Sequence, residues 1–176
     1  MAVIKVLESK RIYEGKIFSV RSDRVDFGNG CVAVREVAEH GGAVCVLPVD
    51  ENGTVYLVRQ YRHAAGRDVL EAPAGGMEPG ETPEEAALRE LREETGASGT
   101  LIPMGEYLPT PGYCSEKIYL FCARVTGFGE TDFDEDEFLS TETYPFAEFY
   151  QMARDGRISD GKTIAAALRA DGLWDR

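Results

Sequence analysis

Three glutamates close together in the sequence have a spacing that suits metal chemistry. Glu90, Glu93 and Glu94 stand at positions i, i+3 and i+4 of the segment 83–95, so they share one side of a predicted helix. Like charges at this spacing repel by roughly 0.2–0.5 kcal/mol per pair, and the helix dipole is negative at the same end. A positive group is therefore expected close to these carboxylates.

Two kinds of group could supply this positive charge. Arg89 and Arg92 lie in the same segment and could form ion pairs on a solvated acidic face. Alternatively, the carboxylates bind divalent cations, because Mg²⁺ prefers oxygen ligands and completes its shell with water and substrate phosphates. Helical periodicity alone does not decide between these interpretations.

The residues around the predicted helix favour the metal. They follow the pattern G-x5-E-x7-R-E-U-x-E-E-x-G-U, where U is an apolar residue. The matching positions are Gly75, Glu81, Arg89, Glu90, Leu91, Glu93, Glu94, Gly96 and Ala97. This segment resembles the signature of the Nudix hydrolases.

The resemblance implies hydrolysis of the diphosphate linkage of a nucleoside diphosphate derivative, with Mg²⁺ as the cofactor and Mn²⁺ as an alternative ion. The metal ligands it implies are Glu90, Glu93, Glu94 and the carbonyl of Ala74, and Glu93 and Glu94 also count as catalytic residues. Arg89 would orient the carboxylates by ion pairing.

Further segments resemble the bacterial ADP-ribose pyrophosphatases within that family. They are VRQYR (58–62), EAPAG (71–75), TPGYCSE (110–116) and GRISDGKT (156–163). The favoured reaction is therefore cleavage of ADP-ribose to AMP and ribose 5-phosphate. The implied substrate-binding residues are Arg62, Glu71, Gly112 and Glu116. Other nucleotide sugars or dinucleotides, such as GDP-mannose or NADH, are alternative substrates, and a non-catalytic nucleotide sensor is a third hypothesis.

The resemblance places the general base in the acidic loop 134–137. Glu135 or Glu137 could fill this role, and we favour Glu137 because the E-F-L sequence at 137–139 resembles the start of a strand in the family. The alternative interpretation of the loop is a solvated run of charge.

The elements that would position these residues form a mixed α/β (α+β) fold. Apolar patterns predict strands at 4–13, 17–27, 31–38, 43–49, 54–61 and 117–125, and helices at 83–95, 146–154 and 163–170. Gly-Asn-Gly at 28–30 and Asp-Glu-Asn-Gly at 50–53 predict hairpin turns. Thr82 and Glu85 form a predicted capping box, and Gly96 follows the helix end. The resemblance implies an α/β/α sandwich around a mixed sheet.

The N-terminal strands are expected to form a separate antiparallel extension, residues 1–40, before a Nudix domain at 41–176. The resemblance implies a homodimer that exchanges these strands and stacks the adenine on an aromatic side chain near the interface. Tyr13, Phe18 and Phe27 are candidates for that role, although each suits ordinary packing as well.

The bulk composition limits the partners. A formal net charge of -12 opposes binding to nucleic-acid polymers or to anionic membrane surfaces. With no long apolar run or signal-peptide pattern, we expect a cytoplasmic protein. The four cysteines lack a C-x-x-C pair, which favours buried free thiols over zinc or disulfides.

One further motif suggests a different class of enzyme. Residues 156–163 satisfy G-x-x-x-x-G-K-T, the phosphate-binding loop of P-loop nucleotidases. Such a loop must follow a buried parallel strand, whereas the segment before it predicts an amphipathic helix. Gly156 is therefore expected to end one helix and Asp160 to cap the next.

Overall fold

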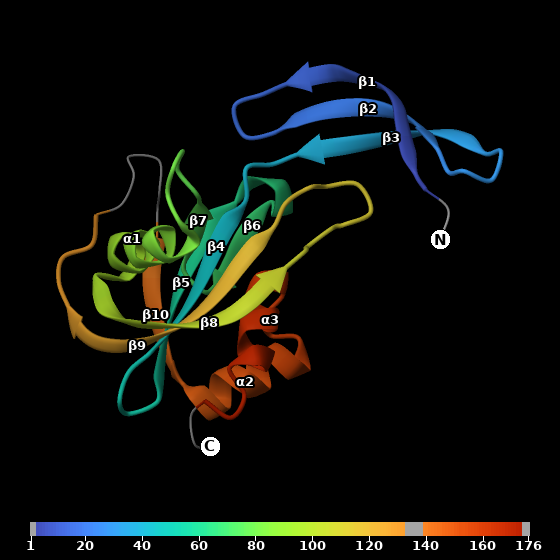
Figure 1. The fold of residues 1–176 in the computed structure, drawn as a ribbon. Coiled ribbons are helices and arrows are strands. Elements are labelled where there is room, and N and C mark those ends of the chain that lie inside the picture. The colour runs from blue at the N-terminus through green and yellow to red at the C-terminus, as the bar shows by residue number, and fades with distance from the viewer. Residues whose placement is uncertain (1–2, 133–138, 174–176) are drawn as a thin grey trace. The chain divides into compact units, whose positions relative to one another are not determined.

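The computed structural model describes residues 3–132 and 139–173 and divides into two compact units. The first unit contains Met1–Gly42 and Leu108–Lys117, and the second contains Ala43–Tyr107 and Ile118–Arg176. Each unit has its own β-sheet (Figure 1).

A three-stranded antiparallel sheet forms the first unit. Its strands, in the spatial order β1-β2-β3, are β1 (Lys5–Glu14), β2 (Ser19–Asp26) and β3 (Val32–Glu39). Gly28 and Gly30 have positive φ in the turn between β2 and β3, so the predicted hairpin is confirmed. The loop 108–117 joins the sheet because the N–H of Ala38 donates to the carbonyl of Tyr113 at 2.8 Å.

A seven-stranded mixed sheet forms the second unit. Its path runs β10-β5-β4-β9-β8, with β6 paired to β5 and β7 paired to β4. The strands are β4 (Ala43–Val49), β5 (Thr54–Arg62), β6 (Arg67–Glu71), β7 (Ala74–Gly76), β8 (Ala97–Tyr107), β9 (Ile118–Phe128) and β10 (Leu139–Pro145). β4 and β9 run parallel, and the other pairs are antiparallel.

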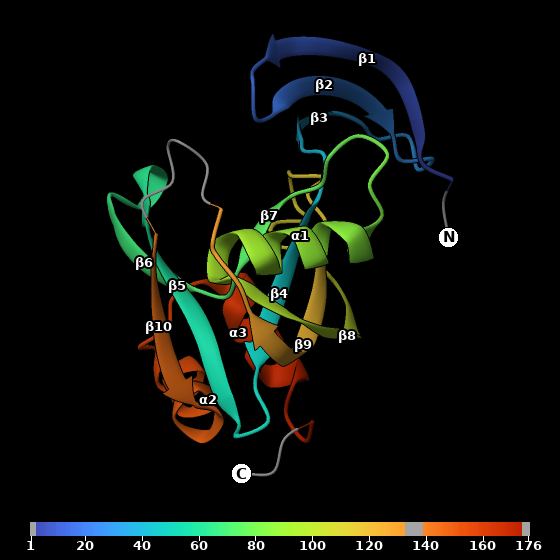
Figure 2. The ribbon, with the colours of Figure 1, turned by 90° about the vertical axis from the view of Figure 1, so that its left-hand side faces the viewer.

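The predicted hairpin of β4 and β5 is correct at its turn and wrong along its length. Val49 and Val55 are paired beside the turn, and beyond them the two strands diverge (Figure 2). β4 pairs instead with β7 and β9, while β5 pairs with β6 and β10. The strands separate because each finds longer ladders elsewhere in the sheet.

Helices cover both faces of this sheet. The helices are α1 (Pro83–Thr95) on one face, and α2 (Phe146–Asp155) and α3 (Gly161–Arg169) on the other (Figures 1 and 2). Successive side chains of β4 point to opposite faces of the sheet and pack against both helical layers. Val46 belongs to the apolar cluster of Leu91 in α1, and Leu47 belongs to the cluster of Phe149 in α2. The predicted α/β/α sandwich around a mixed sheet is confirmed.

The limits of α1 agree with the predicted signals. Thr82 Oγ1 accepts from the N–H of Glu85 at 3.3 Å, and the Glu85 carboxylate accepts from the N–H of Thr82 at 2.9 Å. Gly96 ends the helix with φ of 68°, and a Cβ there would lie 2.4 Å from the carbonyl oxygen of Gly129. The caps set where the helix begins and ends, while the buried side chains of Ala87 and Leu91 set which side faces the sheet.

The G-x-x-x-x-G-K-T segment joins two helices. Gly156 ends α2 with φ of 83°, and Asp160 caps α3 by accepting from the N–H of Thr163 at 2.9 Å. Because a helix precedes the segment, the P-loop interpretation is wrong and the predicted caps are confirmed.

Two expectations from composition can be compared with the structure. Cys45 and Cys122 are buried, and burial raises the pKa of both thiols to about 12. Cys31, directly before β3 of the three-stranded sheet, is exposed and Cys114 is only partly buried, so the expectation of buried thiols fails for these two. Among the residues that the structure describes, no helix is long and apolar enough to span a bilayer.

Replacing Thr82 with alanine should lower the free energy of unfolding by about 1 kcal/mol, because the N–H of Glu85 loses its capping partner. Urea denaturation would measure the change. Thr131→Ala, at an exposed position outside the helices, is the control and should stay within about 0.5 kcal/mol of the parent. Equal effects of the two substitutions would contradict the capping role.

Candidate active site

The acidic side of α1 is much less exposed than a solvated helix face. The exposed fraction is 8% for Glu90 and 2% for Glu94, whereas the Glu93 side chain is 26% exposed. A buried carboxylate requires positive charge or hydrogen-bond donors. The interpretation of a simple solvated face is therefore wrong for Glu90 and Glu94.

Arg89 gathers the carboxylates around one guanidinium group. It forms a two-pronged ion pair with Glu81 at 2.9 and 3.0 Å and also donates to Glu90 at 2.6 Å and to Glu93 at 3.1 Å. A further bond at 2.9 Å reaches the carbonyl of Gly76. The hydrogen bond to Glu81, followed by the contacts with Glu90 and Glu93, raises the pKa of Arg89, so the arginine stays charged.

Strand β7 lies directly against these carboxylates. The N–H of Ala74 donates to Glu94 Oε2 at 3.1 Å, and a Cβ built on Gly75 would lie 2.1 Å from Glu90 Oε1. A side chain at residue 75 would therefore displace Glu90. The glycine of the sequence motif is explained by this close approach rather than by an unusual backbone angle.

A small pocket opens beside this arrangement. Its volume is about 250 Å³, and its lining residues are Gly75, Gly76, Glu78, Arg89, Glu90, Glu93 and Asp132. The N–H of Asp132 donates to the carbonyl of Glu93 at 3.0 Å, which holds the residue at the end of α1. Asp132, which comes directly before the acidic loop, was not predicted from the sequence as a site residue.

The donors around the pocket fit a hard divalent cation. They are carboxylate and carbonyl oxygens, the ligands that Mg²⁺ and Mn²⁺ accept. Within residues 3–132 and 139–173, no three His, Cys, Asp or Glu side chains form a ready metal cluster, and Glu90 and Glu93 turn toward Arg89. An ion would thus compete with Arg89 for oxygens that are already gathered in one place.

Two predicted substrate residues, Arg62 and Glu71, form a second ionic cluster. The Arg62 guanidinium donates to both oxygens of Glu71, at 2.8 and 2.7 Å, and Lys162 also contacts that carboxylate. Burial alone would raise the pKa of Glu71, but the bonds from Arg62 and the charge of Lys162 outweigh it and lower the pKa. The hydrogen bond to Glu71 is the main cause that raises the pKa of Arg62, and the charge of Glu94 adds to it, so the two clusters are electrostatically connected.

The other four predicted site residues lie in the first unit or outside the described residues. Gly112 and Glu116 belong to the first unit, where Glu116 Oε1 lies 3.7 Å from His40 Nδ1. Glu135 and Glu137 lie outside the described residues. The roles assigned to all four remain predictions.

The candidate base-stacking aromatics also belong to the first unit. The rings of Tyr13 and Phe18 are 5.7 Å apart between centroids, and the Arg35 guanidinium lies 5.0 Å from the centroid of Phe27. Each ring therefore has a packing partner, and none is singled out as the adenine platform.

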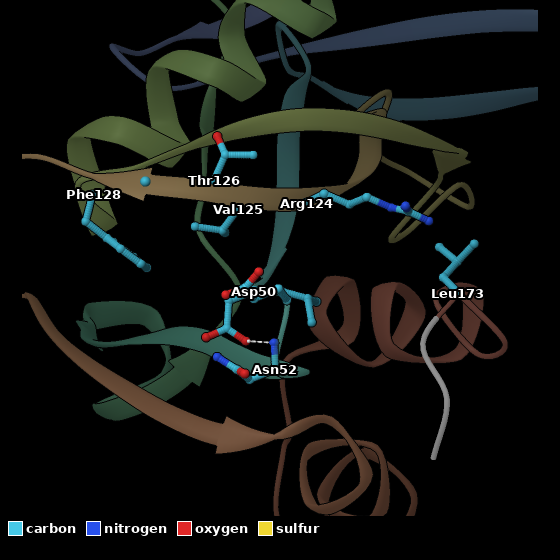
Figure 3. A pocket seen from close by; sticks show the side chains of 10 residues that line it. Asp50, Asn52, Arg124, Val125, Thr126, Phe128 and Leu173 are labelled. Carbon is cyan, nitrogen blue, oxygen red and sulfur yellow. Dashed lines mark hydrogen bonds between the residues drawn. The ribbon is translucent and has the colours of Figure 1, made fainter.

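A larger pocket, of about 730 Å³, lies away from the acidic motif. It is formed by the β4–β5 turn, the end of β9 and Leu173 (Figure 3). Asp50 in its wall accepts from the N–H groups of Asn52 and Thr54, at 2.9 and 2.8 Å, and thereby closes the turn. No carboxylate of the motif lines this pocket, so its size does not make it the active site.

Comparisons with known proteins agree with the geometry. A family model described as the NUDIX domain matches residues 33–169. The ADP-ribose pyrophosphatase of Bacillus subtilis (strain 168) is 33% identical over 92% of this chain and 89% of its own length. The GDP-mannose pyrophosphatase of Yersinia enterocolitica is 36% identical over 79% of this chain and 78% of its own. A crystal structure of an ADP compounds hydrolase superposes with a TM-score of 0.83 at 25% identity, covering 97% of this chain and 93% of that one.

Gly75→Ala should weaken divalent-ion binding by about tenfold or more, the usual scale for disturbing the support of a ligand, because the new methyl group displaces Glu90. Calorimetric titration with Mn²⁺ would measure the dissociation constant. Gly76→Ala is the matched control, since nothing lies within 4 Å of a Cβ at that neighbouring position. Unchanged Mn²⁺ affinity in a folded Gly75→Ala protein would disprove the close-approach explanation.

Proposed function

Because the chain belongs to the Nudix family and is a Nudix hydrolase, we propose that it cleaves ADP-ribose to AMP and ribose 5-phosphate with Mg²⁺ as cofactor. The observation that carries the proposal is the burial of Glu90 and Glu94 on one side of α1, one helical turn apart and next to a backbone strand. The 33% identity to a relative named ADP-ribose pyrophosphatase supports the choice of substrate.

The metal site we propose consists of Glu90, Glu93, Glu94 and the carbonyl of Ala74. Divalent ions bound there would neutralise the diphosphate and lower the pKa of the attacking water. Gly75 leaves room for Glu90, the N–H of Ala74 orients Glu94, and Arg89 holds Glu90 and Glu93 beside the pocket. Mn²⁺ should replace Mg²⁺, because both ions accept oxygen ligands.

The proposed reaction is attack of water on one phosphorus of the diphosphate. A new P–O bond forms, the bridging P–O bond breaks, and the leaving phosphate takes the bonding electrons. A general base accepts the proton of the water, and we assign this role to Glu137 with Glu135 as the alternative. Asp132 supports the assignment, since it lines the metal pocket and lies just before the acidic loop.

Substrate binding needs local positive charge in a chain whose formal net charge is -12. Arg62 is proposed to contact the substrate, with Glu71 as its buried partner. Gly112 and Glu116 are proposed to complete the substrate-binding site. Arg62 is 41% exposed at its side chain while Glu71 is 3% exposed, so the arginine can present its outer edge to an anion.

A second nucleotide sugar is the main alternative substrate. The 36% identity to a GDP-mannose pyrophosphatase favours GDP-mannose as that alternative. The third hypothesis, a non-catalytic nucleotide sensor, is disfavoured because the carboxylates of the motif are all present in the sequence.

We further propose that residues 1–40 are a dimerisation extension that exchanges strands with a second copy of the chain. Every residue of β1 is exposed, including Ile12, and Val34 on β3 is 59% exposed. A three-stranded sheet with so much exposed apolar surface gains stability by covering it. A homodimer would provide that cover.

A substrate panel tests the activity. With Mg²⁺, ADP-ribose should give a higher kcat/KM than GDP-mannose, UDP-glucose, NADH or ATP, and EDTA should abolish turnover. Glu94→Gln should lower kcat/KM by about 100-fold or more, the scale of losing a main electrostatic stabiliser. Product identification by chromatography would confirm which bond breaks.

Glu84→Gln is the control for that substitution, because Glu84 is an exposed carboxylate in the first turn of the same helix. Its kcat/KM should stay near that of the parent. Similar rates across the panel would refute the substrate assignment, and full activity in EDTA would refute the metal.

Analytical ultracentrifugation tests the dimer. The parent should sediment at twice the chain mass of 19.4 kDa, whereas Ile12→Asp combined with Val34→Asp should give monomers, because charge is introduced into the covered surface. Leu168→Asp, at a position 52% exposed on α3, should leave the dimer intact. A monomeric parent would disprove the proposal.

A further inference from the structure

The first turn of α3 carries a polar network that the proposed reaction does not use. Asp160, Lys162 and Thr163 lie in the segment that imitates a phosphate-binding loop, yet their side chains are directed at the protein. Lys162 is 13% exposed at its side chain, and Thr163 is fully buried. Such a buried set of polar groups must find its partners inside the fold.

Lys162 contacts the buried end of the Glu71–Arg62 pair. Its Nζ donates to Glu71 Oε2 and, at 3.1 Å, to Asp160 Oδ1. Burial alone would lower the pKa of Lys162, but Asp160 and Glu71 outweigh it and raise the pKa, so the lysine is charged. Glu71 is therefore held by Arg62 and by Lys162 at the same time.

Thr163 holds the next residue of the chain after Glu71. Its Oγ1 accepts from the N–H of Ala72 at 2.8 Å and donates to Asp160 Oδ2 at 2.6 Å. The hydroxyl thus satisfies a buried backbone donor that lies outside any strand. Two residues further on, Ala74 is bonded to Glu94.

The segment 71–74 is consequently fastened by two different helices. α3 binds it at Glu71 and Ala72, and α1 binds it at Ala74. One end of the segment carries the partner of Arg62, and the other carries the proposed backbone ligand of the metal. A shift of this short segment would move both.

We propose that Lys162 and Thr163 are positioning residues: Lys162 sets the orientation of Arg62 through Glu71, and Thr163 sets the position of Ala74 through Ala72. The inference rests on the proposed function, which assigns Arg62 to the substrate and Ala74 to the metal. The two residues should also affect different binding steps: Lys162 should govern substrate affinity, and Thr163 should govern metal affinity.

A contribution to the stability of the fold does not by itself explain why Glu71, Arg62 and Lys162 are charged residues. A buried ion pair loses much of its attraction to desolvation, and well-packed apolar side chains often stabilise a protein as well or better. What a charged pair adds is a defined direction for each group, because its hydrogen bonds are geometrically restrictive. Such direction is useful where Glu71 must aim an arginine at a ligand.

The lysine is tested by steady-state kinetics with ADP-ribose and Mg²⁺. Lys162→Met should raise KM by about tenfold with kcat within about threefold of the parent, because a misdirected Arg62 weakens substrate binding. Lys162→Arg, which keeps the positive charge, should recover most of the affinity. Arg157→Gln is the matched control, since Arg157 lies in the same segment but is half exposed and pairs with Asp155.

The threonine is tested by calorimetric titration with Mn²⁺ in the absence of substrate. Thr163→Val should raise the dissociation constant by about tenfold, the scale for disturbing a group that supports a ligand. Thr163→Ser, which keeps the hydroxyl, should bind Mn²⁺ like the parent. Thermal melts identify folded variants, and Lys162→Gln and Thr163→Ala replace any first variant that does not fold.

The outcomes separate this inference from the proposed function. A parent protein that cleaves none of the nucleotides refutes the proposed function itself. An active parent whose folded Lys162 variants keep their KM, and whose Thr163 variants keep their Mn²⁺ affinity, overturns the positioning roles. A fall in kcat as large as the rise in KM, in proportion to the fall in melting temperature and without recovery in Lys162→Arg, would indicate a purely structural role. That result would also overturn the positioning roles.

Discussion

The site depends on the electrostatics of a single helical turn. Glu90, Glu93 and Glu94 bring like charges together, and two of these side chains are almost excluded from water, where an uncompensated charge is very unfavourable. Arg89 offsets this repulsion from within the same helix, and Gly75 omits a side chain so that Glu90 fits. Crowding that destabilises an isolated helix thus creates a place where a cation is stabilising.

The acidic turn of α1 is connected to the sheet through the short backbone segment 71–74. β4 is covered by α1 on one face and by α2 and α3 on the other, and β7 pairs along its edge. The segment 71–74 passes between these layers, so it can be held from both sides. The acidic helix and the arginine cluster are therefore linked by a short peptide that is hydrogen-bonded at both ends, although they come from separate parts of the chain.

Local signals made the helices and most of the strands predictable, whereas β6, β7, β8 and β10 were not predicted. The capping box and Gly96 act within a few residues, so they fixed the bounds of α1 from sequence. β8 contains Pro103 and Gly105, and β10 is a partly polar edge strand, so neither shows a clear apolar alternation. β6 and β7 are short and owe their strand character to neighbours. The contact of Lys162 with Glu71 was hidden for the same reason, since the two residues lie far apart in sequence.

The ion pair of Lys162 and Glu71 joins positions 91 residues apart, whereas the capping box of α1 spans three. Contacts across long loops form late, because chain entropy is lost before the contact is gained. The local bonds of the capping box can thus form before residues 71–74 are held by Lys162 and Thr163. The contacts that fix residues 71–74 come into being only when α3 docks, after the acidic turn of α1 has already been synthesised.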